Sequence, residues 1–92
     1  MAEKNNVLLV LQALDDARAI VEAIQRDNEH AIVENEPAMI KITAPEKLTI
    51  NTATVEEILG REWSTQELQL VLVTLAGNVD EDYDHFTIYW NN

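Results

Sequence analysis

The first third of the chain shows a strand pattern followed by a helix pattern. Val7–Gln12 is rich in leucine and valine without polar alternation, which predicts a strand that is apolar on both faces. Four apolar residues then recur at helical spacing: Ala17, Ile20, Val21 and Ile24. Asp15 and Asp16 precede them and fit a helix N-cap and first turn, and Asp27 with Asn28 ends the pattern. We therefore expect a strand and then an amphipathic helix.

Two short strands joined by a turn are predicted next. Residues 31–34 form a brief apolar run, and Pro37 favours a turn over residues 36–38 because its ring fixes φ. Met39–Thr43 alternates, with Ile40 and Ile42 on one face, which is typical of a half-buried strand. Ala44 to Glu46 makes a second turn. A hairpin over residues 31–43 follows from this pattern.

The second half repeats this order in weaker form. Lys47–Asn51 predicts a strand, and Thr54 with Glu57 matches a capping box that opens a short helix ending at Gly60. Leu68–Leu75 is apolar on both faces and predicts a central strand. Residues 76–78 and the acids after them suggest a turn, and His85–Trp90 alternates as a final strand.

The predicted order is two β-α-β-β halves. Hairpins over residues 31–43 and 68–90 require antiparallel pairing, and two helices can cover one face of the resulting sheet. This is an α+β fold related to the ferredoxin-like arrangement. We expect a short flexible N-terminus over residues 1–6 and a single domain over residues 7–92.

Charge and composition exclude several classes of function. The chain carries a net charge of −11, which argues against binding nucleic acid or an anionic membrane. It has no Cys, so disulfides, thiolate metal sites and cysteine nucleophiles are excluded. No secretory signal or membrane-spanning stretch is evident, so the cytoplasm is the expected location. Residues 62–92 contain six acids and no Lys or Arg, a local negative field that serves solubility or partner steering.

Candidate catalytic and metal-binding residues are few. His85, with Asp82 or Asp84, could form a pair for general base chemistry, but no Ser, Cys or Lys motif accompanies it. Asp80 to Asp84 begins like a calcium-binding loop, yet the sixth position is His85 and the twelfth is Asn91 instead of Gly and Glu. A solvated acidic turn is the simpler interpretation, and we expect no catalytic set, metal or cofactor.

Several segments, taken in order, resemble one protein family over about residues 7–90. They are residues 17–24 (ARAIVEAI), 42–50 (ITAPEKLTI), 54–60 (TVEEILG) with Trp63, and 68–88 with the run TLAGNVDED. Together they resemble the regulatory (coupling or effector) proteins of soluble bacterial diiron multicomponent monooxygenases, with the phenol hydroxylase branch the nearest. The ordered set carries the resemblance, since none of its motifs is diagnostic alone.

The resemblance implies a non-catalytic, cofactor-free protein that binds a diiron hydroxylase and promotes coupled hydroxylation, while a flavin and iron–sulfur reductase supplies electrons. It also implies a contact surface on the strand and turn before the last hairpin. Those residues are Leu72, Thr74, Leu75, Ala76, Gly77, Asn78, Asp80 and Asp82. Because Gly77 would allow close approach of the partner, Gly77→Trp is expected to weaken hydroxylation and leave the fold intact. Two alternatives stay open: a general protein-binding module of ferredoxin-like shape, and a small His/Asp acid–base enzyme.

Overall fold

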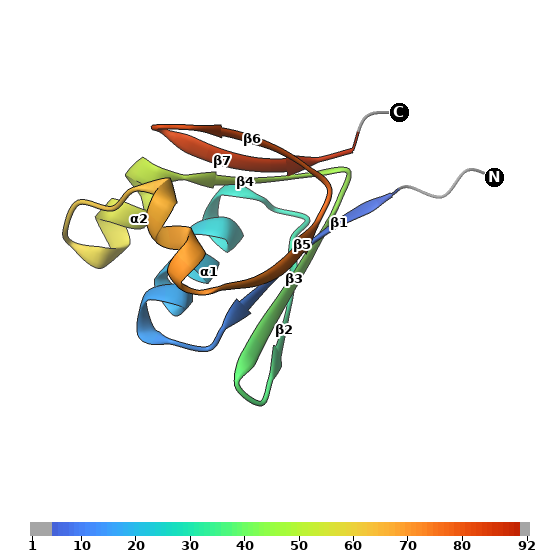
Figure 1. The fold of residues 1–92 in the computed structure, drawn as a ribbon, viewed down its shortest axis with the longest axis horizontal. Coiled ribbons are helices and arrows are strands. Elements are labelled where there is room, and N and C mark those ends of the chain that lie inside the picture. The colour runs from blue at the N-terminus through green and yellow to red at the C-terminus, as the bar shows by residue number, and fades with distance from the viewer. Residues whose placement is uncertain (1–4, 91–92) are drawn as a thin grey trace.

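The strands form two antiparallel sheets, as Figure 1 shows. This computed structural model describes residues 5–90. The elements along the chain are β1 (Asn6–Gln12), α1 (Asp15–Asp27), β2 (Ile32–Glu36), β3 (Met39–Pro45), β4 (Lys47–Asn51), α2 (Thr52–Leu59), the 3-10 helix η1 (Thr65–Leu70), β5 (Leu72–Ala76), β6 (Asn78–Asp82) and β7 (His85–Tyr89). The α+β class, the antiparallel pairing and the packing of helices on sheet are confirmed, whereas the division into two sheets was not predicted.

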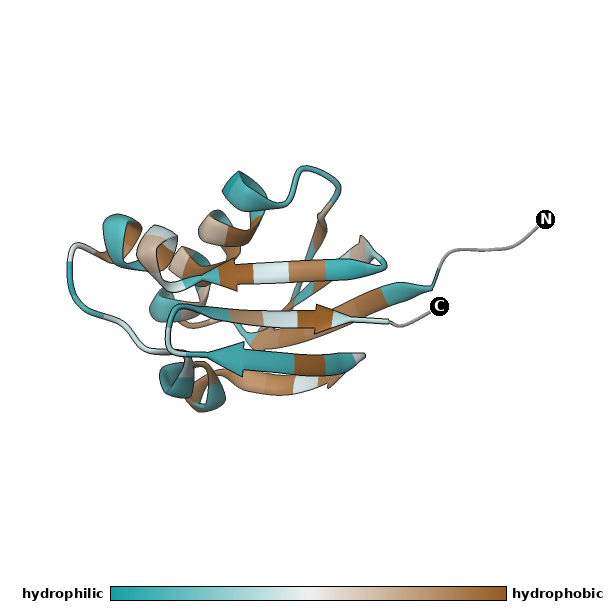
Figure 2. Cartoon of the chain, turned by 90° about the horizontal axis from the view of Figure 1, so that it is seen from above, coloured by the Kyte–Doolittle hydropathy of each residue, from teal (hydrophilic) through white to brown (hydrophobic). Residues whose placement is uncertain are grey.

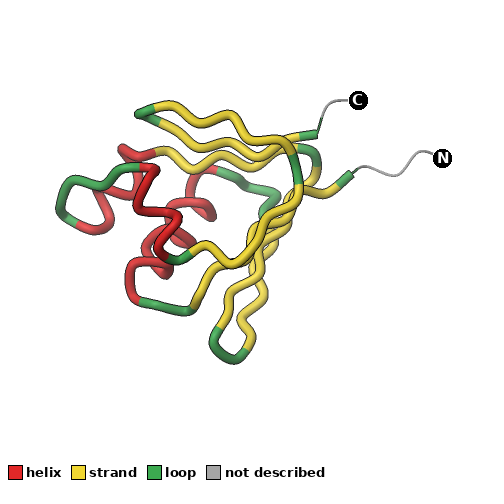
Figure 3. The backbone as a smooth tube through the Cα atoms, viewed as in Figure 1, coloured by secondary structure: helices red, strands yellow, loops and turns green. Residues whose placement is uncertain are grey.

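The first sheet has the strand order β2-β3-β1-β5 and provides much of the core. Alternate residues of β1 are fully buried, namely Val7, Leu9 and Leu11, and they pair with buried Ala44, Ile42 and Ile40 of β3. The apolar face of α1 joins the same core, and all four residues of its predicted stripe are buried. In Figure 3 the helices lie on the inner side of the angle between the two sheets.

The second sheet has the order β4-β7-β6. Its inner face supplies Leu48 and Ile50 from β4 and Phe86 and Ile88 from β7, all of them buried. Asn28, at the end of α1, covers the free edge of β4, since its side chain exchanges two hydrogen bonds with the backbone of Thr49. Viewed from above, in Figure 2, the outer face of this sheet lies in front of the helices with no element over it.

The chain passes between the sheets at two single residues with positive φ. Glu46, between β3 and β4, has a φ of 69°, and Gly77, between β5 and β6, has a φ of 140°. The Glu46 amide donates to the Asn5 carbonyl, and its carbonyl accepts from the Trp90 amide at 3.0 Å. These two corners determine where one sheet stops and the other starts.

The helix starts differ from the prediction. Leu14 occupies the N-cap of α1, so Asp15 and Asp16 lie in the first turn, where their charge still favours the helix N-terminus. Helix α2 begins at Thr52, two residues before the predicted capping box. Thr54 instead donates its hydroxyl to the Asp27 carboxylate at 2.6 Å and so ties α2 to α1. Gly60 ends α2 in the left-handed conformation, as predicted.

The predicted central strand over Leu68–Leu75 is a strand only from Leu72 onward, and its predicted central position is wrong. Residues up to Leu70 form η1, and β5 is an edge strand that pairs with β1. An apolar run fits both states, because Leu68 reaches the core from a helical turn while Leu70 is 73% exposed. The predicted turn at residues 76–78 is also wrong, since only Gly77 bends and β6 follows directly. The final hairpin is therefore β6–β7, with its tight turn at Tyr83 and Asp84.

Candidate docking surface

The residues predicted to contact a partner form one continuous ribbon along two sheet edges. Strand β5 ends the order of the first sheet and β6 ends that of the second, and Gly77 joins them. In Figure 1 this ribbon sweeps from the end of η1 across to the upper sheet. Among residues 5–90 each of these strands pairs on one side only, so its other side presents backbone groups to a partner. We call residues 72–82 the edge ribbon.

The predicted residues in β5 point in opposite directions. Thr74 pairs with Val10 and Ala76 with Leu8, on the face of the first sheet away from the core. Leu75 pairs with Leu9, and both Leu72 and Leu75 pack against the core. A register shift between Val10 and Leu11 accommodates Val73, which is 45% exposed. Thr74 and Ala76 are therefore outward-facing, while Leu72 and Leu75 are largely structural.

Strand β6 is exposed at all five positions. By register, Asn78, Asp80 and Asp82 lie on the outer face, opposite Tyr89, Thr87 and His85 of β7. On the inner side, Glu81 accepts the Thr65 hydroxyl at 2.7 Å, which fastens β6 to η1. Val79, also directed inward, is still 44% exposed. Val73 and Val79 are not among the predicted contact residues, yet they are the exposed large apolar side chains of the edge ribbon.

Gly77 has an intramolecular role that sequence reasoning did not reveal. A Cβ at this position would lie 2.5 Å from Cγ2 of Ile88 and 3.3 Å from the Tyr89 carbonyl oxygen. Separations that short require the core or the backbone to shift. The close approach that Gly77 permits is thus between the two sheets of this chain. Gly77→Trp cannot leave the fold intact, so that prediction is wrong in its structural half.

His85 lies between two carboxylates at the end of the final hairpin. Its Nδ1 is 2.8 Å from Oδ1 of Asp84, and its Nε2 is 3.5 Å from Oδ2 of Asp80. The hydrogen bond to Asp84 raises the pKa of His85 above 6.5, with Asp80 adding to the effect against partial desolvation. Both ring nitrogens therefore face carboxylates of this chain. Asp82, the other acid predicted to pair with His85, contacts the backbone of Tyr83 instead.

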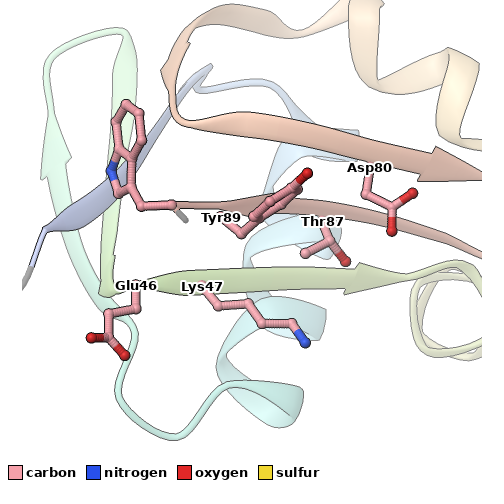
Figure 4. A pocket seen from close by; sticks show the side chains of 6 residues that line it. Glu46, Lys47, Asp80, Thr87 and Tyr89 are labelled. Carbon is pink, nitrogen blue, oxygen red and sulfur yellow. The ribbon is translucent and has the colours of Figure 1, made fainter. Parts of the chain in front are cut away.

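A shallow pocket of about 390 Å³ opens on the outer face of the second sheet. It is lined by Glu46, Lys47, Asp80, Thr87, Tyr89 and Trp90. Figure 4 shows the Tyr89 ring beside Thr87, with the Lys47 side chain running along the neighbouring strand. The Trp90 indole donates to the Asn6 carbonyl at 2.9 Å, which holds that ring at the rim. Trp63, in contrast, is a core residue with 5% exposure.

Metal binding and membrane crossing can be tested on the described part of the chain. Within residues 5–90, no group of three or more His, Asp or Glu side chains is arranged to hold a metal ion. The acids of β6 and its turn are thus not gathered as in a calcium loop. Neither helix in this range has the length and apolar character needed to cross a bilayer. An exposed sheet edge with an adjoining pocket favours a role in binding another protein.

Comparison with known proteins agrees with this class. The chain belongs to the MmoB/DmpM family, which it matches over residues 5–89. It is 50% identical to the stimulatory component DmpM of phenol 2-monooxygenase from Pseudomonas sp. (strain CF600), over 94% of this chain and 96% of that protein. The family resemblance predicted from the sequence is confirmed.

Solved structures show the same fold. A chain from the structure of a phenol hydroxylase–regulatory protein complex is 47% identical, with a TM-score of 0.90, over 95% of this chain and all of that one. Regulatory protein B of soluble methane monooxygenase aligns with a TM-score of 0.75 over 99% of this chain and 69% of its own, at 22% identity. That more distant likeness extends to the fold alone.

Proposed function

We propose that this chain is the non-catalytic stimulatory subunit of a multicomponent phenol monooxygenase and that it binds the diiron hydroxylase component. The observation that carries the proposal is 50% identity to a phenol 2-monooxygenase stimulatory component across nearly the full length of both chains. A 47% identical chain occurs in the structure of a phenol hydroxylase–regulatory protein complex. The acid-flanked ring of His85 gives no comparable support to the acid–base enzyme.

The edge ribbon is the proposed contact surface for the hydroxylase. Its outward-facing members are Thr74 and Ala76 in the first sheet and Asn78, Asp80 and Asp82 in the second, with Val73 and Val79 as exposed apolar contacts. Leu72, Leu75 and Gly77 hold the ribbon in shape from below. A standard interface of roughly 800 Å² per partner is within reach of a protein this size.

Docking would act through a difference in affinity. A bound protein shifts a hydroxylase equilibrium only when it binds one hydroxylase state more tightly than the other. In this proposal the favoured state couples electrons from the flavin and iron–sulfur reductase to hydroxylation of a phenol-type aromatic substrate. In this proposal the subunit works in the cytoplasm, contains no cofactor and folds as a single domain over residues 7–92. Residues 1–4 of the expected flexible N-terminus lie outside the described residues, and Asn6 belongs to β1 instead.

The test is reconstitution with purified hydroxylase and reductase of a phenol monooxygenase. Adding this chain should raise the product formed per NADH consumed, and the chain alone should form none. Thr74→Arg, which places a large cation on the outer face of β5, should abolish most of the stimulation. Ile32→Arg, which places a cation on the same face but at the opposite edge strand β2, at a side chain that is 60% exposed, is the control. Unchanged turnover with wild-type chain would contradict the proposal.

A further inference from the structure

The outer face of the second sheet combines features that suit a cationic side chain. It is uncovered in Figure 2, and its pocket has two carboxylates, from Glu46 and Asp80, against the single ammonium of Lys47. The walls include the aromatic rings of Tyr89 and Trp90. A guanidinium or ammonium group stacks favourably on such rings and forms charge-assisted hydrogen bonds with carboxylates.

The register shows how these groups converge. Lys47 of β4, Tyr89 of β7 and Asn78 of β6 share one row, and Thr87 and Asp80 share the next. Figure 4 shows the Tyr89 ring between the Glu46 end and the Asp80 end of the pocket. A planar cation lying over Tyr89 would therefore reach a carboxylate. The volume of about 390 Å³ is within the range of ligand-sized pockets.

Lys47 occupies this pocket with its own positive charge. Among the residues that the structure describes, no carboxylate lies within ion-pair distance of its ammonium, although Asp80 lines the same pocket. Its flexible stem lets the charged end move into solvent at small cost. A cation from a partner would then replace it between the carboxylates and the rings.

We propose that this pocket receives an arginine or lysine side chain from the hydroxylase, beside the contact made by the edge ribbon. The inference rests on the proposed function, and the two surfaces are continuous because Asn78 and Asp80 belong to both the ribbon and this face. The wider charge distribution agrees, since residues 62–92 carry six acids and no Lys or Arg and therefore attract a basic surface.

Two opposite charge changes provide the decisive test. The dissociation constant for purified phenol monooxygenase hydroxylase is measured with each variant. Asp80→Asn should raise it about fivefold to tenfold, because a charge-assisted hydrogen bond is lost. Lys47→Met should lower it about twofold to threefold, because the competing cation is removed while the stem is kept. If the pocket received an anion instead, both signs would be reversed, and that result would overturn the proposal.

Matched variants separate this effect from structural damage. Tyr89→Phe should keep the affinity, whereas Tyr89→Leu should weaken it about threefold through loss of the ring. Glu36→Gln removes an exposed strand carboxylate far from the pocket and should change nothing. His85→Gln removes the imidazole partner of Asp80 and should keep the dissociation constant within about twofold of the wild-type value. The larger effect expected of Asp80→Asn would then come from the carboxylate itself. Thermal unfolding of each variant checks that the fold is retained.

The outcomes also distinguish the two proposals. A wild-type chain that fails to bind the hydroxylase would overturn both the proposed function and the pocket. A wild-type chain that binds, with Asp80→Asn and Lys47→Met both neutral, would overturn the pocket alone.

Discussion

The two sheets of this protein are specified by different kinds of residue. In the first sheet, the central strand β1 alternates fully buried and half-buried side chains, so burial fixes its register. In the second, β6 is exposed at every position and three of its five residues are acids. It is held by the backbone ladder to β7, by the Thr65–Glu81 hydrogen bond and by the corner at Gly77. Most of the stability therefore comes from the first sheet and from the buried faces of β4 and β7. The side chains of β6 are little constrained by packing and can be suited to binding a partner.

The largest expected effect on the free energy of unfolding comes from truncating a buried side chain of the first sheet, compared with an exposed one of the second. Leu9→Ala removes a fully buried side chain of β1 and should lower the free energy of unfolding by about 2–5 kcal/mol. Val79→Ala in β6, at a side chain that is 44% exposed, should lower it by about 0.5 kcal/mol. Urea denaturation measures both. Similar losses at the two positions would show that β6 contributes more than its exposure indicates.

The corner between the sheets should be nearly as sensitive. Gly77→Ala combines an unfavourable φ with a Cβ 2.5 Å from Ile88, and should destabilise the fold by about 2–4 kcal/mol. Gly60→Ala is the matched control, because its φ is also positive but no atom lies within 4 Å of the added Cβ. It should lose only about 1 kcal/mol. Equal melting temperatures for the two variants would contradict the packing role given to Gly77.

A substitution at Glu46, the other residue where the chain passes between the sheets, should have a smaller effect and should raise the free energy of unfolding. Glu46 holds a φ of 69° that disfavours a side chain, so Glu46→Gly should raise the free energy of unfolding by about 0.5–1 kcal/mol. Glu36→Gly, in the ordinary strand β2, should lower it by a similar amount, because glycine there gains freedom only in the unfolded chain. Chemical denaturation of the pair distinguishes strain at the corner from a general effect of glycine.

The smallest effect concerns the final hairpin and its dependence on pH. Since the pKa of His85 is raised above 6.5 in the fold, its protonated form favours the native hairpin. That stabilisation is complete below 6.5 and disappears as pH rises through the raised pKa. Asp84→Asn should bring the midpoint of the His85 ring resonance, followed by NMR, back toward 6.5. A midpoint that does not move would show that the contact at 2.8 Å does not persist in solution.

The elements predicted best are those whose apolar residues recur at the period of a strand or a helix. The strand at Val7–Gln12, the helix with Ile20 and Ile24 on its buried face, and the hairpin of β2 and β3 all follow from alternation or helical spacing. The resemblance to the regulatory family supplied the contact residues of the edge ribbon, and their contact role stays a prediction. Its position on two sheet edges agrees with a contact role, which the proposed experiments test.

What could not be predicted depends on tertiary geometry. Asn78–Asp82 contains no apolar period, so its acids indicate a turn although β7 pairs with all five residues. The split into two sheets depends on the positive φ of Glu46 and Gly77, and a glutamate gives no sign of that conformation. The direction of Thr74 and Leu75 depends on the register shift beside Val10, which is set by pairing with β1.

The carboxylates of β6 have one more consequence. This strand presents an unpaired backbone edge and a partly exposed valine, a combination that invites the same strand of a second molecule to add to the sheet. Such a pairing would bring Asp80, Glu81 and Asp82 close to the same acids of the second molecule, and like charges repel. We propose above that acids of this strand attract a basic partner. The same negative charge also discourages two copies of this chain from pairing through β6.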